Sequence, residues 1–294
     1  MDQFQPPFRW NLRFRESLGS LVEGERAAAY PEFADDLLAC AAQCVAFSQN
    51  ADMYFIGRSP ESLFDLLSGL LLDTPWSERL QLVQFSMRFV TEGSIRREIP
   101  GAIQGIRTYF RLLEMSPEQL IARKQRIALI DLVASGETLG NLVGLLHTWT
   151  RELGLDWRAV KAKICIVGIT WEEDPSPHTW RWRQHADWVG LLNRQTIKNI
   201  AIPRRLWRYL GDQQDKVTES FHPWRWSGAE LAVPNYNDQH LLALRLAVDL
   251  FDMGRTRACR ERFVRLLSHE QAMRTPWLRS LAHRVIPSGT RFRK

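Results

Sequence analysis

Cysteine, histidine and long apolar runs are scarce in this 294-residue sequence. Its four cysteines show no paired metal-binding spacing, and Cys40 and Cys44, four residues apart in a helical pattern, are expected to pack in the core. The seven histidines are scattered, without the spacing of a metal site. The sequence therefore favours a protein with reduced thiols and no cysteine- or histidine-based metal centre.

Signals for secretion and for the membrane are also missing. Residues 1–7 have no basic head followed by an apolar core, and no apolar run approaches the length that spans a bilayer. Internal repeats and low-complexity tracts are absent as well. We expect a cytoplasmic protein with no membrane partner.

What the sequence does contain is an ordinary globular composition with an excess of basic charge. Hydrophobic residues make up 45% and charged residues 24%, which suits one large domain or a medium domain with a companion. The net charge of +6 and the 12 tryptophans, most of them after residue 145, permit an anionic partner. That partner could be a phosphorylated small molecule or a nucleic acid, and composition does not choose between them.

Buried-strand patterns alternate with helical patterns along the first two thirds of the chain. Apolar runs typical of parallel strands occur at 52–57, 127–133 and 163–170. Residues 80–90 alternate roughly between apolar and polar and are expected to form another strand, and 199–203 is a further candidate. This order predicts an α/β fold with a mostly parallel sheet flanked by helices and an α-rich C-terminal extension. In such a sheet the ligand site lies at the carboxyl ends of the strands.

Three regions are expected along the chain. Residues 1–30 would form an N-terminal arm, residues 31–205 the α/β domain, and residues 206–294 a mainly helical C-terminal region. Helices in the last region are expected at 238–253, 256–267 and 269–284, with Asn237 and Ser268 as N-caps.

Residues 126–140 combine a buried strand, an acid, a small-residue turn and a helix. The acid at the end of the strand is Asp131, Ser135 and Gly136 turn the chain, and a helical pattern resumes at Thr138. A strand that ends in a tight turn opening a helix points free backbone N–H groups at one place, which suits a phosphate.

This stretch resembles the phosphoribosyl-diphosphate (PRPP) motif of type I phosphoribosyltransferases, and the resemblance covers about residues 50–170. The family pattern is four apolar residues, two acids, two or three apolar or small residues, then Thr, Gly, any residue and Thr. Here Ile130 occupies the place of the first acid and Asp131 that of the second. The rest of the pattern is matched by Leu132, Val133, Ala134, Ser135, Gly136 and Thr138.

The resemblance implies a phosphoribosyltransferase-like fold that binds PRPP, or a related phosphorylated ribose or nucleotide, with Mg²⁺ as cofactor. Asp131 would be the catalytic carboxylate and the metal ligand, because an acid near the ribose holds its hydroxyls and offsets positive charge in the transition state. Ser135, Gly136, Glu137 and Thr138 would hold the 5′-phosphate. The implied activity is the transfer of phosphoribose to a base or another amine, with release of diphosphate.

A second pattern of strand, turn and helix surrounds Gly57, Arg58 and Ser59. By the same resemblance these residues would bind the diphosphate, a task that suits the fork of an arginine. The tripeptide Ser-Pro-Glu at 59–61 is also an ordinary helix start, and it recurs at 116–118 with no strand before it. Both interpretations of the first loop stay open.

Other basic and aromatic residues carry further hypotheses. The polar residues 91–99 could form a mobile loop with Arg96 and Arg97 as phosphate contacts, or a plain solvated loop. The runs 180–183 and 224–226 alternate tryptophan and arginine. Such runs either stack on nucleic-acid bases or pack as an apolar face with arginines at the surface.

Three functions from different classes remain open. The chain is a phosphoribosyltransferase, a non-catalytic sensor of PRPP or a nucleotide with the same fold, or a subunit of a nucleic-acid-associated assembly such as a bacterial retron-type antiviral defence system. In the last case the basic, Trp- and Arg-rich C-terminal half would contact the nucleic acid or a protein partner. The sequence does not decide whether the chain is an enzyme or whether it forms a homo-oligomer.

Overall fold

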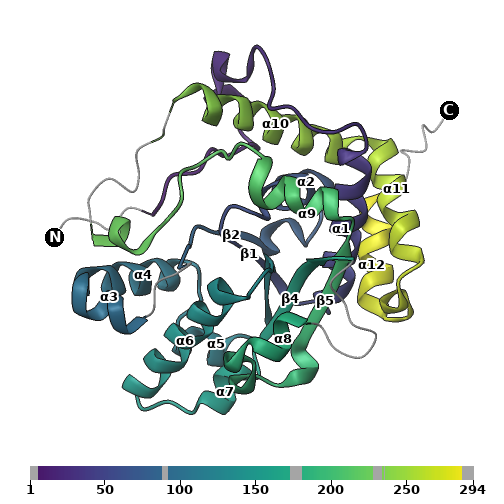
Figure 1. The fold of residues 1–294 in the computed structure, drawn as a ribbon. Coiled ribbons are helices and arrows are strands. Elements are labelled where there is room, and N and C mark those ends of the chain that lie inside the picture. The colour runs from purple at the N-terminus through teal and green to yellow at the C-terminus, as the bar shows by residue number, and fades with distance from the viewer. Residues whose placement is uncertain (1–5, 88–91, 173–180, 228–233, 235, 287–294) are drawn as a thin grey trace.

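A computed structural model describes residues 6–87, 92–172, 181–227, 234 and 236–286 of the chain. Five strands form one sheet in the order β2-β1-β3-β4-β5, and every neighbouring pair runs parallel (Figure 1). The expected α/β class with a parallel sheet is therefore confirmed. The strands are β1 Asp52–Ile56, β2 Leu80–Val83, β3 Ile127–Leu132, β4 Ile164–Trp171 and β5 Ile197–Ile202.

The central strand β3 is apolar on both faces because helices cover both faces of the sheet. Ala128 and Ile130 lie in one core cluster, whereas Ile127 and Leu129 lie in another, as the alternation of side chains along a strand requires. The predicted buried strands thus contribute side chains to both core clusters, one on each face of the sheet.

Helices on the first face carry residues of the core cluster that contains Ala128. They are α1 Phe33–Phe47, α2 Glu61–Leu70, α9 Arg204–Arg208, α10 Asp238–Arg255, α11 Arg257–Ser268 and α12 Pro276–Val285. Helices on the second face carry residues of the cluster that contains Ile127. They are α3 Glu92–Glu98, α4 Pro100–Leu112, α5 Pro117–Ala122, α6 Glu137–Glu152, α7 Trp157–Lys161 and α8 Arg181–His185.

The C-terminal helices share their core with the sheet. Helix α9 runs across residue 205, where the C-terminal region was expected to begin, and Phe263 of α11 lies in the same cluster as Leu66 of α2. Cys40 and Cys44 lie in this cluster too, buried and with free thiols, as expected. None of the helices in the described ranges is long and apolar enough to cross a bilayer.

Two expectations for the 80–99 stretch are wrong. Strand β2 ends at Val83, not near residue 90, because the N–H group of Gln84 donates to the hydroxyl of Tyr109 at 3.0 Å instead of to a strand neighbour. The expected polar loop is helix α3, which an ion pair between Arg96 and Glu92 at i and i+4 stabilises. Residues 88–91 lie outside the described part of the chain.

The termini of the C-terminal helices are partly as expected. Asn237 does cap α10, since its side chain accepts from the N–H group of His240. The third helix begins at Pro276, not at residue 269, and Ser268 ends α11 instead of capping the next helix. A proline at the first helical position already has the required φ, which explains the later start. The N-terminal arm contains two short 3-10 helices, Arg15–Ser17 and Gly19–Val22.

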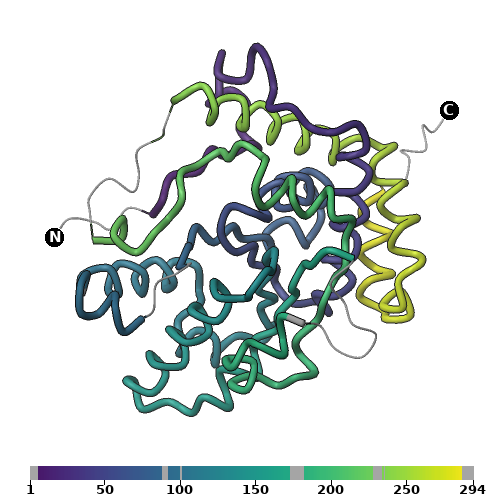
Figure 2. Tube along the Cα trace, viewed as in Figure 1, coloured from purple at the N-terminus to yellow at the C-terminus, as the bar shows by residue number. Residues whose placement is uncertain are grey.

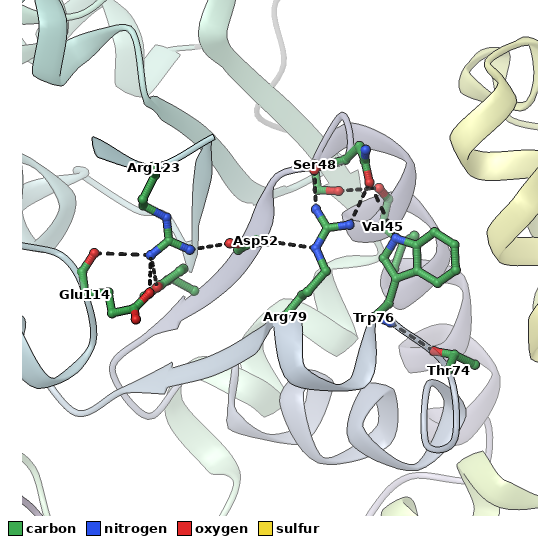
Figure 3. A network of polar contacts seen from close by, with 10 residues as sticks. Val45, Ser48, Asp52, Thr74, Trp76, Arg79, Glu114 and Arg123 are labelled. Atoms are coloured by element: carbon green, nitrogen blue, oxygen red, sulfur yellow. Dashed lines mark hydrogen bonds and ion pairs between the residues drawn. The ribbon is translucent and has the colours of Figure 1, made fainter. Parts of the chain in front are cut away.

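A network of charges closes the amino edge of the sheet, on the side opposite to the strand carboxyl ends (Figure 3). Asp52 at the start of β1 lies between two arginines: it accepts from Arg79 Nε at 2.7 Å and from Arg123. Arg123 also donates to the Tyr54 hydroxyl at 3.1 Å and pairs with Glu114. Asp52, Arg79, Arg123 and Glu114 thus form a network of paired charges at this edge.

A segment of the C-terminal half returns to the carboxyl edge of the sheet. Residues 209–222, called the bridging segment below, follow α9 and run beside the N-terminal arm (Figure 2). Val217 of this segment packs with Leu12 and Leu18 of the arm and with Leu244 of α10. Two remote parts of the chain are thereby brought beside the strands that carry the predicted site.

Candidate functional site

A pocket of 430 Å³ lies at the carboxyl ends of β1 and β3. Strand β2 lies on one side of β1, whereas β4 and β5 follow on the far side of β3, so the direction of strand addition reverses between β1 and β3. Ligands of parallel sheets bind at such a point. All eight residues predicted for the site line this one pocket. They are Gly57, Arg58, Ser59, Asp131, Ser135, Gly136, Glu137 and Thr138. The structure brings them together, and their roles in binding stay predictions.

The first wall of the pocket is the loop between β1 and α2. Gly57 has a φ of 74°, and a Cβ atom there would lie 3.2 Å from the carbonyl oxygen of Phe85, so the turn requires glycine. Ser59 does not cap the helix: the N-cap is Pro60, and no side chain caps α2. At the same position of the repeated tripeptide, Ser116 does cap α5, with a complete capping box to Gln119. Of the two interpretations of the 59–61 loop, the ordinary serine cap is therefore wrong.

The second wall is the loop between β3 and α6. Gly136 is the N-cap of α6 with a φ of 82°, and it has no side chain to occupy the first N–H groups of the helix. Trp182 packs against this glycine, since a Cβ atom there would lie 3.2 Å from the indole. The positive end of a 16-residue helix thus faces the pocket without a side-chain cap.

Asp131 lies at the floor of the pocket. It pairs in register with Gly168 of β4 and is 7% exposed. Burial raises the pKa of its carboxyl well above the usual range, although the N–H group of Leu132 donates to it. Ile130 points to the opposite face of the sheet, where it is buried in the first core cluster. Neighbouring residues of a strand face opposite sides, and of these two positions it is Asp131 that lines the pocket.

The third wall, the bridging segment, holds cations that sequence reasoning missed. Lys216 and His222 line the pocket together with Arg58. Arg58 donates to the carbonyl oxygen of Thr218 at 3.1 Å, and no carboxylate in the described ranges forms an ion pair with Arg58 or Lys216. Burial lowers the pKa of all three groups, and for Lys216 the pKa falls to about 8. Arg58 and Lys216 are thus partly buried cations without an ion-pair partner among the described residues, and such cations favour the binding of an anion.

The bridging segment is held in place by the start of α2. Gln214 donates to the Ser62 hydroxyl at 2.6 Å, and the N–H group of Val217 donates to Glu61 at 3.1 Å. Glu61 and Asp65 also accept from Arg9 of the N-terminal arm, at 2.9 and 2.7 Å. A buried ion cluster thus links the arm, α2 and the segment that carries Lys216.

The pocket has few groups of its own for a metal ion. In the described ranges, no three His, Cys, Asp or Glu side chains are placed to hold one. Asp131 is the buried carboxylate, and Asp212 and Glu137 line the pocket at its exposed side. This set suits Mg²⁺ better than a transition metal, because Mg²⁺ is commonly held by one or two carboxylates, water and the phosphates of a ligand.

Other residues singled out from the sequence lie elsewhere. Arg96 pairs with Glu92 and Glu152, and Arg97 with Glu98, so neither reaches the pocket in this arrangement. These pairs do not support the expected phosphate contacts.

The two runs of tryptophan and arginine each place one indole in the core. Trp182 is 3% exposed and donates to Asn199 at 2.9 Å, and Trp226 is 4% exposed and stacks near Tyr109. Trp224, in contrast, is 55% exposed and stacks on His222. Packing thus accounts for two of these indoles, and Trp180 lies outside the described residues.

A second pocket of 500 Å³ adjoins the first across the 134–137 loop. Ala134, Ser135 and Glu137 line both pockets. Its far wall is aromatic: Trp182 and Trp188 stack with ring centroids 5.9 Å apart. A planar ring would fit such a wall.

Comparison with protein-family models, curated proteins and solved structures finds no match to this chain. The function of the pocket is therefore inferred from its own residues.

Proposed function

We propose that the protein binds PRPP, or a closely related phosphorylated ribose compound, in the pocket at the carboxyl ends of β1 and β3. One observation carries this proposal: Arg58 and Lys216, which form no ion pair within the described ranges, line the same 430 Å³ pocket as the uncapped N-terminus of α6 and the buried carboxylate of Asp131. A phosphorylated sugar has the matching groups, namely anionic ends and hydroxyls between them.

Each wall has a part in this proposal. Arg58 and the backbone amides of Arg58 and Ser59 hold the diphosphate, because a guanidinium and backbone N–H groups both donate to phosphate oxygens. Ser135 and Thr138, with the first amides of α6, hold the 5′-phosphate. Asp131 accepts from the ribose hydroxyls, and these donors favour the ionised carboxylate that burial alone disfavours.

Transfer to an amine is the activity that the resemblance to phosphoribosyltransferases implies. The acceptor would enter from the adjoining pocket, where Trp182 and Trp188 offer an aromatic wall. Its nitrogen would bond to C1 of the ribose while the bond from C1 to the diphosphate oxygen breaks. The bonding pair leaves with diphosphate, and one amine proton passes to solvent. Asp131 would offset the positive charge that develops on the sugar.

The proposal includes Mg²⁺ as an ion that enters the pocket bound to the phosphates of the ligand. It would be held by phosphate oxygens, by water and by Asp131, and when bound it neutralises charge on the departing diphosphate. Among the described residues that line the pocket, Asp131 is the single buried carboxylate, which is consistent with an ion that arrives with the phosphates.

A second candidate function is sensing without turnover. It is favoured by Ile130, which occupies the place of one of the two acids of the family and is buried on the far face of the sheet. A site with one ribose-binding carboxylate could retain affinity for PRPP and lack the stabilisation that transfer requires.

Calorimetric titration with PRPP and Mg²⁺ tests both candidates. We expect saturable binding below millimolar concentration, whereas an absence of heat at millimolar PRPP would refute both. Release of diphosphate with a panel of nucleobases and other amines then separates them: release that depends on the acceptor indicates the transferase, and tight binding without release indicates the sensor.

A further inference from the structure

Lys216 occupies an unusual position for a lysine side chain. Its amine donates to the carbonyl oxygen of Leu210 at 2.7 Å and to the side-chain oxygen of Gln214 at 3.0 Å, both uncharged acceptors. An ammonium group has three donors, so one is left over where Lys216 lines the pocket.

Charged groups from several elements surround Lys216, and none of the carboxylates forms an ion pair with it within the described ranges. From the arm comes Arg9, from the loop after β1 comes Arg58, from α2 come Glu61 and Asp65, and from its own segment comes Asp212. Glu61 is already engaged by Arg9 and by the N–H group of Val217. Arg58 and Lys216 therefore line one pocket, while the buried acids Glu61 and Asp65 are hydrogen-bonded to Arg9.

We propose that Lys216 and Arg58 together form a subsite for a diphosphate group, in which Lys216, contributed by the C-terminal half, binds the anion directly. The proposal rests on the proposed function of the pocket and adds to it a binding residue outside the resemblance. A single carboxylate would be matched by Arg58 alone, whereas a diphosphate carries several negative charges and presents oxygens to both a planar fork and a point charge. The bridging segment is thus part of the ligand site.

The subsite should respond to pH. Burial lowers the pKa of Lys216 to about 8, so the amine loses its charge as the pH rises through that value. The affinity for diphosphate should therefore be full below pH 7 and fall between pH 7 and pH 9. The arginine of a Lys216→Arg variant stays charged throughout this range, so the fall in affinity that comes from deprotonation of residue 216 is absent in this variant.

The test is calorimetric titration of the full chain with inorganic diphosphate at pH 6.5 and pH 9. Loss of one charge-assisted hydrogen bond is worth about 10- to 100-fold in affinity, so Lys216→Met should weaken binding at pH 6.5 by that factor. Lys216→Arg should bind at pH 6.5 and show a smaller loss at pH 9 than the wild type. Lys124→Met, which removes an exposed lysine remote from the pocket lining, is the control and should bind like the wild type.

Several outcomes overturn the inference. They are no binding of diphosphate by the wild type, equal affinity in Lys216→Met, or the same pH profile in the wild type and in Lys216→Arg. The last comparison remains informative if Lys216→Met fails to fold. If diphosphate binding depends on Lys216 but PRPP binds no more tightly than diphosphate, this inference stands and the proposed ribose site fails.

Discussion

Two glycines on successive turns of α6 provide a test of the second pocket and its aromatic wall. A Cβ atom at Gly140 would lie 2.4 Å from Cδ1 of Trp188, whereas a Cβ atom at Gly144 would meet no atom within 4 Å. The two positions share one helix and its propensity, so alanine at either should gain about 0.5–1 kcal/mol from the loss of glycine flexibility. Only Gly140→Ala must also displace an indole.

At Gly140 the steric cost of displacing Trp188 determines whether alanine stabilises or destabilises the fold. Overpacking of this kind costs about 1–3 kcal/mol. Gly144→Ala should therefore raise the free energy of unfolding by about 0.5–1 kcal/mol, and Gly140→Ala should leave it unchanged or lower it by up to about 2.5 kcal/mol. The difference between the two variants isolates the contact with Trp188, because the propensity gain cancels.

Urea denaturation followed by circular dichroism measures both values by linear extrapolation. The result that would refute the reasoning is an equal stabilisation by the two alanines. In that case Trp188 would not lie on Gly140, and the aromatic wall beside the 134–137 loop would have to be abandoned.

Two further predictions concern the helix starts and the ion cluster. Ser116→Ala should lower the free energy of unfolding by about 1 kcal/mol, because it removes a capping box. Ser59→Ala should leave the free energy of unfolding nearly unchanged and weaken PRPP binding, and a loss of stability in this variant would show that Ser59 does cap α2. Arg9→Met should destabilise the fold by about 3–5 kcal/mol in the same urea assay, because it leaves the buried Glu61 and Asp65 without their counter-ion. A loss below about 1 kcal/mol for Arg9→Met would mean that the arm does not hold α2.

The strands other than β2 could be predicted closely from local pattern alone. Parallel strands that are covered on both faces leave continuous apolar runs, and the residues that follow such a run must lie at one edge of the sheet. For this reason the sequence alone predicts that Arg58, Asp131 and Ser135 lie in one place, and they do line one pocket.

Boundaries that depend on tertiary contacts could not be predicted in this way. The pattern of strand β2 continues past Val83, yet the hydroxyl of Tyr109 takes the N–H group that a longer strand would need. The 92–98 stretch looks like a loop because it is polar, and it is a helix whose charged residues pair along one side.

Lys216 and His222 could not be predicted as site residues either, because their place in the pocket also depends on tertiary structure. They follow the last strand and stand in no motif, and only the path of the bridging segment brings them to the carboxyl edge. The signal that could have drawn attention to them is indirect: once Arg96 and Arg97 are paired with carboxylates, the predicted site keeps one arginine for a ligand with several phosphates.

The central claim is that Asp131 holds a ribose beside a phosphate subsite. The most direct measurement is calorimetric titration of Asp131→Asn with PRPP and with inorganic diphosphate, compared with the wild type and with Glu118→Gln, which changes an exposed acid on α5. We predict that Asp131→Asn weakens PRPP binding by about 10- to 100-fold and leaves diphosphate affinity nearly unchanged, and that Glu118→Gln alters neither. Equal PRPP affinity in Asp131→Asn and in the wild type would contradict the account.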